Sequence, residues 1–170
     1  MGLFDLFFHQ SPTTLTVRRS ILPLAAKKEI LSGRLPRINT NKLFTKQDEF
    51  CCYIEKALLL VDKTKHIYET HGINTPGFFK GNRHHWGTGF AREYTETKEF
   101  KAILYITNKR IVLQCKGHGF DKAYRYLSAI EPYSNGIELQ YGDKTYSIIL
   151  PDGAIAYQVI KMIQQGGSVN

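Results

Sequence analysis

The pattern of apolar and polar residues predicts a chain built mostly of β-strands. In residues 102–107 both alternating sets are apolar or β-favouring, which is typical of a strand covered on both faces. The polar residues 107–110, Thr-Asn-Lys-Arg, interrupt this run, and Asn tolerates the left-handed backbone of a tight turn. We therefore predict a hairpin here, with residues 111–113 as the returning strand.

The same reasoning predicts further strands and turns on both sides of this hairpin. Asn135-Gly136 and Gly142-Asp143 are typical hairpin turns. The predicted strands are residues 50–61, 66–70, 83–86, 89–94, 121–127, 137–141 and 145–150. The predicted turns and loops are the charged segments 62–65 and 94–99, residues 72–77, and residues 116–119.

A helix is predicted near each end of the chain. The N-terminal helix is expected to start at Ser11-Pro12, to kink or break at Pro23 and to end at Gly33. Near the other end Asp152 is a good N-cap, and the apolar residues that follow share one helical face: Ala156, Val159, Ile160 and Ile163. We divide the chain into a helical N-terminal arm and linker (1–41), a main domain (42–166) and a tail (167–170).

Two segments of the main domain resemble a known family. The sequence LYITNKRI at residues 104–111, followed by LSAIEPYSNGIEL at residues 127–139, is similar to the core of bacterial pleckstrin-homology-like and GRAM-like domains. This resemblance implies seven antiparallel strands in two near-orthogonal sheets, closed by a C-terminal helix. The expected fold class is thus α+β: a pleckstrin-homology-like β-sandwich or partly open barrel with a helical N-terminal arm. It also implies a scaffold for binding rather than for catalysis.

The composition indicates which kind of partner and which cellular compartment to expect. The 170 residues carry a formal net charge of +8, which favours anionic partners: nucleic acid, anionic lipid headgroups or acidic proteins. No apolar run reaches the roughly 18 residues of a membrane span. The apolar tip, residues 1–8, is expected either to touch a membrane or to pack on its own domain. The thiols Cys51, Cys52 and Cys115 form no CxxC pair, so we expect free thiols and a cytoplasmic location, with membrane-peripheral association left open.

The resemblance implies where a phosphate group would bind. In lipid-binding members of the family the first hairpin loop carries basic residues, and here that loop would contain Lys63, Lys65 and His66. Lys109 and Arg110 could add charge from the neighbouring turn. The alternatives are a solvated turn at 62–66 and an Arg110 that braces its hairpin through backbone carbonyls.

Residues 84–86, His-His-Trp, form the second candidate surface. His84 and His85 point to opposite faces of a strand, so they cannot chelate a metal together, and no HxH or HxxxH spacing is present. We predict no metal and no cofactor. Trp86 is either a core residue or an exposed aromatic side chain for a partner, so all three residues are candidates for partner binding.

The expected function is that of a non-enzymatic interaction module. It would bind a protein segment along a strand edge or groove, or bind an anionic membrane surface weakly. The alternative is a nucleic-acid-binding protein, because basic and aromatic residues are interleaved at Lys122, Tyr124, Arg125 and Tyr126. An unpaired sheet edge could also join copies of the chain into a homo-oligomer.

Overall fold

The computed structural model describes residues 19–76 and 83–166, with side chains for residues 19–65 and 93–166. The N-terminal tip, the proposed helix start at Ser11-Pro12 and the tail 167–170 lie outside this range. The chain divides into two compact units, Met1–Val61 with Glu99–Asn170, and Asp62–Lys98. Each unit is described by itself below.

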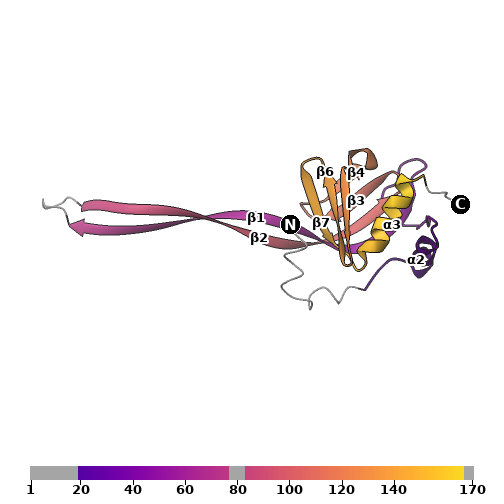
Figure 1. Ribbon diagram of the computed structural model, residues 1–170, viewed down its shortest axis with the longest axis horizontal. Helices are drawn as coiled ribbons and strands as arrows, with labels where there is room; N and C mark the ends of the chain where they lie inside the picture. Colours follow the sequence, from indigo (N-terminus) through magenta and orange to yellow (C-terminus); the bar gives the residue numbers. More distant parts are fainter. Residues whose placement is uncertain (1–18, 77–82, 167–170) are drawn as a thin grey trace. The chain divides into compact units, whose positions relative to one another are not determined.

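Seven antiparallel strands form one sheet that is not closed (Figure 1). Their order across the sheet is β4-β3-β2-β1-β7-β6-β5, so β4 and β5 are the two ends. The bounds are β1 Cys51–Pro76, β2 Arg83–Thr107, β3 Arg110–Cys115, β4 Phe120–Ala123, β5 Ala129–Tyr133, β6 Gly136–Tyr141 and β7 Lys144–Ile149. A 3₁₀ turn, η1, covers Tyr124–Tyr126. The α+β class with about seven antiparallel strands is confirmed, as are the three hairpin turns at 107–110, 135–136 and 142–143.

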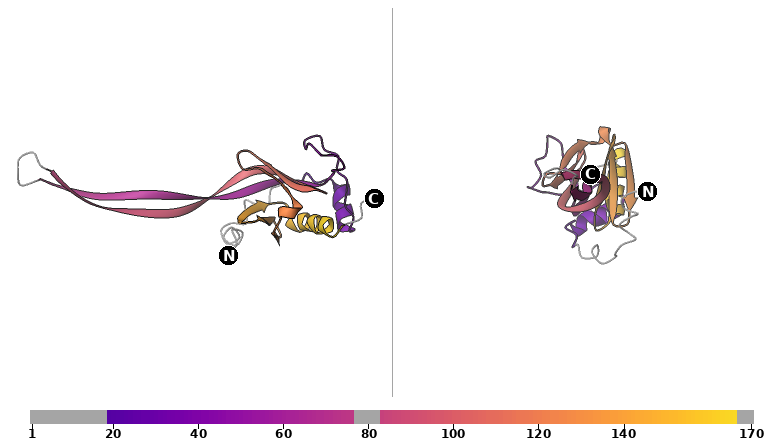
Figure 2. Two further views of the ribbon diagram at one scale, coloured as in Figure 1. Left: turned by 90° about the horizontal axis from the view of Figure 1, so that it is seen from above. Right: turned by 90° about the vertical axis from the view of Figure 1, so that its left-hand side faces the viewer.

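The helix α3, Gly153–Gln164, packs on β5 and β6 and closes one face of the sheet (Figure 2). The carboxylate of Asp152 accepts hydrogen bonds from the backbone N–H groups of Ala154 (3.1 Å) and Ile155 (3.3 Å), which confirms the predicted cap. The buried residues of α3 are Gly153, Ile155, Ala156, Val159 and Ile160. The side-chain amide of Gln158 donates to the carbonyl of Ile30 (2.8 Å), which ties α3 to the short helix α2, Leu24–Leu31.

The C-terminal part of β2, residues 102–107, packs on both faces, as its sequence predicts. Leu104 and Ile106 belong to the main core beneath α3, whereas Tyr105 packs with Leu43, Cys51 and Val112 on the other face. Cys52 lies in the main core, so the adjacent thiols of Cys51 and Cys52 face opposite sides. Burial raises the pKa of Cys51 to about 11 and that of Cys52 to about 12, so both remain free, protonated thiols.

The predicted charged turn at 62–65 and loop at 94–99 are wrong. Both segments are strand, in β1 and β2. The hydroxyl of Thr97 donates to the carboxylate of Asp62 (2.6 Å), and the ammonium of Lys65 lies 2.5 Å from the carboxylate of Glu96. All four residues from Asp62 to Lys65 are exposed. Side chains on both faces of this part of β1 therefore contact solvent, and its charged residues do not indicate a turn.

Four smaller boundaries also differ from the predictions. β2 is continuous where two short strands, 83–86 and 89–94, were expected, and residues 72–76 are strand rather than loop. Pro23 does not kink a longer helix but stands at the N-cap of α2. The predicted strand 121–127 ends at Ala123, where η1 begins.

Two tyrosines on the core face, the partly buried Tyr124 and the buried Tyr141, differ in whether their hydroxyl groups have hydrogen-bond partners. The hydroxyl of Tyr124 donates to the carbonyl of Thr107 (2.6 Å). The buried hydroxyl of Tyr141 finds no hydrogen-bond partner among the described residues. A buried hydroxyl without a partner costs about 1–3 kcal/mol.

We therefore expect opposite results from two Tyr→Phe substitutions. Tyr141→Phe should leave the free energy of unfolding unchanged or raise it by up to about 1 kcal/mol, because only an unpartnered hydroxyl is removed. Tyr124→Phe should lower it by about 1 kcal/mol and leave the carbonyl of Thr107 unpaired. Urea unfolding of both variants checks this, and equal losses would contradict it.

Candidate functional site

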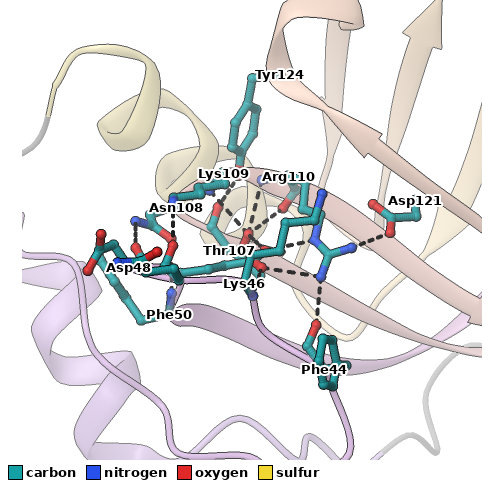
Figure 3. A network of polar contacts seen from close by, with 12 residues as sticks. Phe44, Lys46, Asp48, Phe50, Thr107, Asn108, Lys109, Arg110, Asp121 and Tyr124 are labelled. Atoms are coloured by element: carbon teal, nitrogen blue, oxygen red, sulfur yellow. Dashed lines mark hydrogen bonds and ion pairs between the residues drawn. The ribbon is translucent and has the colours of Figure 1, made fainter.

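The Thr-Asn-Lys-Arg turn, which supplies two of the predicted phosphate ligands, is an internal clamp (Figure 3). Arg110 is 9% exposed. Its guanidinium donates to Glu49 through Nε (2.7 Å) and Nη2 (3.2 Å), to the carbonyl of Phe44 through Nη2 (2.7 Å), and to Asp121 through Nη1. These acceptors within the protein occupy the guanidinium, so it has no free pair of N–H donors for a phosphate.

The other three residues of this turn have internal partners as well. The hydroxyl of Thr107 donates to the carboxylate of Glu49 (2.7 Å) and accepts from the backbone N–H of Lys109 (3.1 Å). Asn108 accepts from the backbone N–H of Phe50 (3.0 Å) and donates to the carbonyl of residue 48 (3.0 Å). Lys109 donates its ammonium to the carbonyl of residue 47 (2.5 Å). The clamp, residues 107–110, thus fastens residues 44–50 to the β2–β3 turn.

The pair Arg110–Glu49 is charged at neutral pH. Burial alone would raise the pKa of Glu49, but hydrogen bonds from Arg110, the Lys46 backbone N–H and Thr107 outweigh it and hold the pKa below its ordinary value. The hydrogen bond with Glu49 raises the pKa of Arg110. The side chain of Glu49 is 0% exposed, so its charge depends on these partners.

The remaining predicted ligands lie in the other unit. Lys63, Lys65 and His66 are strand residues of β1 in Asp62–Lys98, so they form no hairpin loop and are not part of the unit that holds Lys109 and Arg110. Lys65 is paired with Glu96, and its ammonium lies 5.8 Å from the ring centre of Tyr94. The side chains of His66, His84, His85 and Trp86 lie outside the described residues.

A groove that sequence reasoning missed lies along β1 and β2. Its volume is about 720 Å³. Ile103, which packs with the cluster around Tyr105, lines it and is paired across strands with Gln114. We define the basic groove by its lining residues, Arg19, Lys56, Ala57, Lys101, Ala102, Ile103 and Gln114.

The charge of the basic groove is positive and uncompensated. Arg19, Lys56 and Lys101 are exposed, and none forms an ion pair within the part of the chain that the structure describes. Among the described residues that line the groove there is no carboxylate. The lining is apolar at Ile103, whereas Ala57 (1% exposed) and Ala102 (8% exposed) are small and belong to the main core. This arrangement suits an anionic ligand that also carries apolar groups.

Two polar residues hold the walls of the groove in position. The buried carboxylate of Glu55 accepts hydrogen bonds from the backbone N–H of Ile21 (2.8 Å) and from the hydroxyl of Ser20, which holds the segment that carries Arg19. Gln114 accepts from the hydroxyl of Tyr105 (3.3 Å) and donates to the carbonyl of residue 42 (3.2 Å). Among the described residues Glu55 forms no ion pair with the neighbouring Lys56.

The sequence contains only a faint signal for this groove. Glu55-Lys56 interrupts the apolar stretch of β1 at residues 51–61, and Lys101 directly precedes the apolar run of β2. A cationic residue next to fully buried strand positions is a reasonable mark of a functional face. Only the pairing of β1 with β2 shows that the two lysines share one cavity.

Compared with protein-family models, with curated proteins and with solved structures, the chain matches none of them. Among the residues described, no helix has the length and apolar character needed to cross a membrane. Within the same residues, no group of three or more His, Cys, Asp or Glu side chains is placed to hold a metal ion.

We expect the clamp to make stability depend on pH in the acid range. Glu49 has a lowered pKa in the folded protein, so its contribution is present above the ordinary value of 4.5 and is lost as the pH falls through the folded value. Glu49→Gln should cost about 3 kcal/mol at pH 7, because Arg110 loses its buried carboxylate partner and keeps only Asp121, whose side chain is 51% exposed. The loss should be smaller near pH 3, because Glu49 of the parent protein gains a proton as the pH falls toward its lowered pKa.

Urea unfolding at both pH values measures this difference. Glu138→Gln is the control, since this carboxylate accepts a hydrogen bond from Ser147 (2.9 Å) but forms no ion pair among the described residues. A Glu49→Gln loss of the same size at pH 7 and pH 3 would show that the charge of Glu49 contributes nothing.

Proposed function

We propose that the protein is a non-enzymatic interaction module of the pleckstrin-homology-like type and that its basic groove binds an acidic segment of a partner protein. Three features support the pleckstrin-homology-like type. The strands follow one another around an open sheet in which β1 adjoins both β2 and β7, and the amphipathic helix α3 packs on one face. The Thr-Asn-Lys-Arg clamp is the third feature in favour of this type.

The observation that carries the binding proposal is the set of three cations that form no ion pair among the described residues and that surround the apolar side chain of Ile103. An acidic segment supplies carboxylates to Arg19, Lys56 and Lys101, and its apolar side chains can cover Ile103. The volume of about 720 Å³ lies within the range of about 300–1,000 Å³ that is usual for ligand cavities. Among the described lining residues there is no Ser, Cys, His, Asp or Glu, which favours binding over catalysis.

An anionic membrane is the less suitable partner for this groove. A bilayer surface contacts side chains that protrude, but Ala57 and Ala102 are small and at most 8% exposed. A narrow chain segment reaches such residues more readily than a layer of headgroups does. The free thiols suit a reducing compartment, which supports a cytoplasmic setting for the interaction.

The proposal predicts a charge-specific effect on peptide binding. The probe is a fluorescent peptide in which Glu alternates with Leu, titrated with the full chain in low salt. The double variant Lys56→Glu/Lys101→Glu should weaken binding by about tenfold or more, because two attractive contacts become repulsive. Added salt should weaken binding to the parent protein.

A matched double variant separates the groove from the overall charge. Lys116→Glu/Lys144→Glu changes two exposed lysines outside the groove and lowers the net charge by the same amount. This variant should bind the peptide nearly as well as the parent protein. Equal losses in the two double variants would contradict the groove, and binding to vesicles of anionic lipid but not to the peptide would contradict the choice of partner.

A further inference from the structure

A second cavity lies where the open sheet fails to close. It is about 540 Å³ in volume. One wall comes from β4 and η1, near one end of the sheet, and the other from β6 and the residue before β5, near the other end. We call it the seam cavity; its lining residues are Asp121, Lys122, Ala123, Tyr126, Ser128, Tyr141 and Gly142.

The seam cavity contains a cation that is held in position but has no carboxylate partner of its own among the described residues. The ammonium of Lys122 lies 4.9 Å from the ring centre of Tyr141 and 5.3 Å from that of Tyr146. It forms no ion pair within the described part of the chain. The carboxylate of Asp121 also lines the cavity, and it pairs with Arg110, which pairs with Glu49 as well. Among the described residues Lys122 thus has no carboxylate partner of its own, and its ammonium can contact an anion in the cavity.

The same cavity offers an aromatic face and further hydrogen-bond donors. Tyr126 is 55% exposed, and the guanidinium of Arg125 lies 4.7 Å from its ring centre. The oxygen of Ser128 accepts from the backbone N–H of Gly142 (3.0 Å), so its hydroxyl proton is left to donate. Tyr124, in contrast, is committed to the carbonyl of Thr107, so it is not part of this surface.

We propose that the seam cavity binds one nucleotide unit, with the flat base against the exposed ring of Tyr126 and the phosphate at the ammonium of Lys122. Bases stack on aromatic side chains with little regard to their identity. A lysine acts as a point charge that suits the several oxygens of a phosphate. This site is separate from the basic groove and does not depend on what the groove binds.

Titration calorimetry at low salt with four probes tests the proposal. The probes are adenosine monophosphate, adenosine, inorganic phosphate and a short single-stranded oligoadenylate. A nucleotide should bind more tightly than either adenosine or phosphate alone, because only it supplies both the ring and the anion. Tyr126→Ala and Lys122→Gln should each weaken binding by about tenfold.

Two controls match these variants. Tyr94→Ala removes another exposed tyrosine that has a lysine near its ring, and Lys56→Glu/Lys101→Glu changes only the groove. Both should bind nucleotide as the parent protein does. Tight binding of the monophosphate indicates a free nucleotide as ligand, and binding of the oligomer alone indicates a nucleic-acid strand; both support the site. No binding of either, binding of phosphate as tight as that of the nucleotide, or equal effects of Tyr94→Ala and Tyr126→Ala would overturn it.

Discussion

The buried ion pair between Arg110 and Glu49 is the contact on which the arrangement of the described sheet depends. It joins residues 61 positions apart and connects the segment before β1 to the β2–β3 turn. Moving two charges out of water is costly, and such a pair is maintained only when its other hydrogen-bonding groups are satisfied. Here the hydroxyl of Thr107, the backbone N–H of Lys46 and the carbonyl of Phe44 supply those partners. The Thr-Asn-Lys-Arg sequence is thus explained by structure, and ligand binding has to be sought elsewhere.

The clamp also shapes the sheet around the basic groove. By fastening residues 44–50 it positions the preceding segment, in which Leu43 packs on Cys51, Tyr105 and Val112. That segment covers part of the sheet face on which Tyr105 lies. Its carbonyl at residue 42 accepts a hydrogen bond from Gln114, which lines the basic groove. The groove and the seam cavity therefore have different origins. The first is a stretch of sheet that the linker does not cover, and the second is a consequence of a sheet that does not close.

The elements that the sequence predicts well are those encoded by a few neighbouring residues. Asn135-Gly136 specifies its own turn, and Asp152 specifies the start of α3 through contacts within three residues. The failures involve pairing over long distances. Asp62 and Lys65 are typical of a turn in the sequence, but in the structure they contact Thr97 and Glu96 across two strands. Lys56 and Lys101 are brought to one cavity only by the pairing of β1 with β2. No local spacing carries that information, so neither the continuous strands nor the groove could be deduced from the sequence.

The ribbon Asp62–Lys98 differs from the sheet core in what stabilises it. Where its side chains are described, polar and ionic contacts link the strands, and two strands alone are at best marginally stable in water. Its backbone amides should therefore exchange with solvent deuterium through local opening, at rates unrelated to global unfolding. The amides around Leu104 and Ile148, which are 0% exposed, should exchange only when the whole core opens. Salt screens the contact between Lys65 and Glu96 but has little effect on buried apolar contacts. Higher ionic strength should therefore change the exchange rate of the ribbon amides and leave that of the amides around Leu104 and Ile148 almost unaltered.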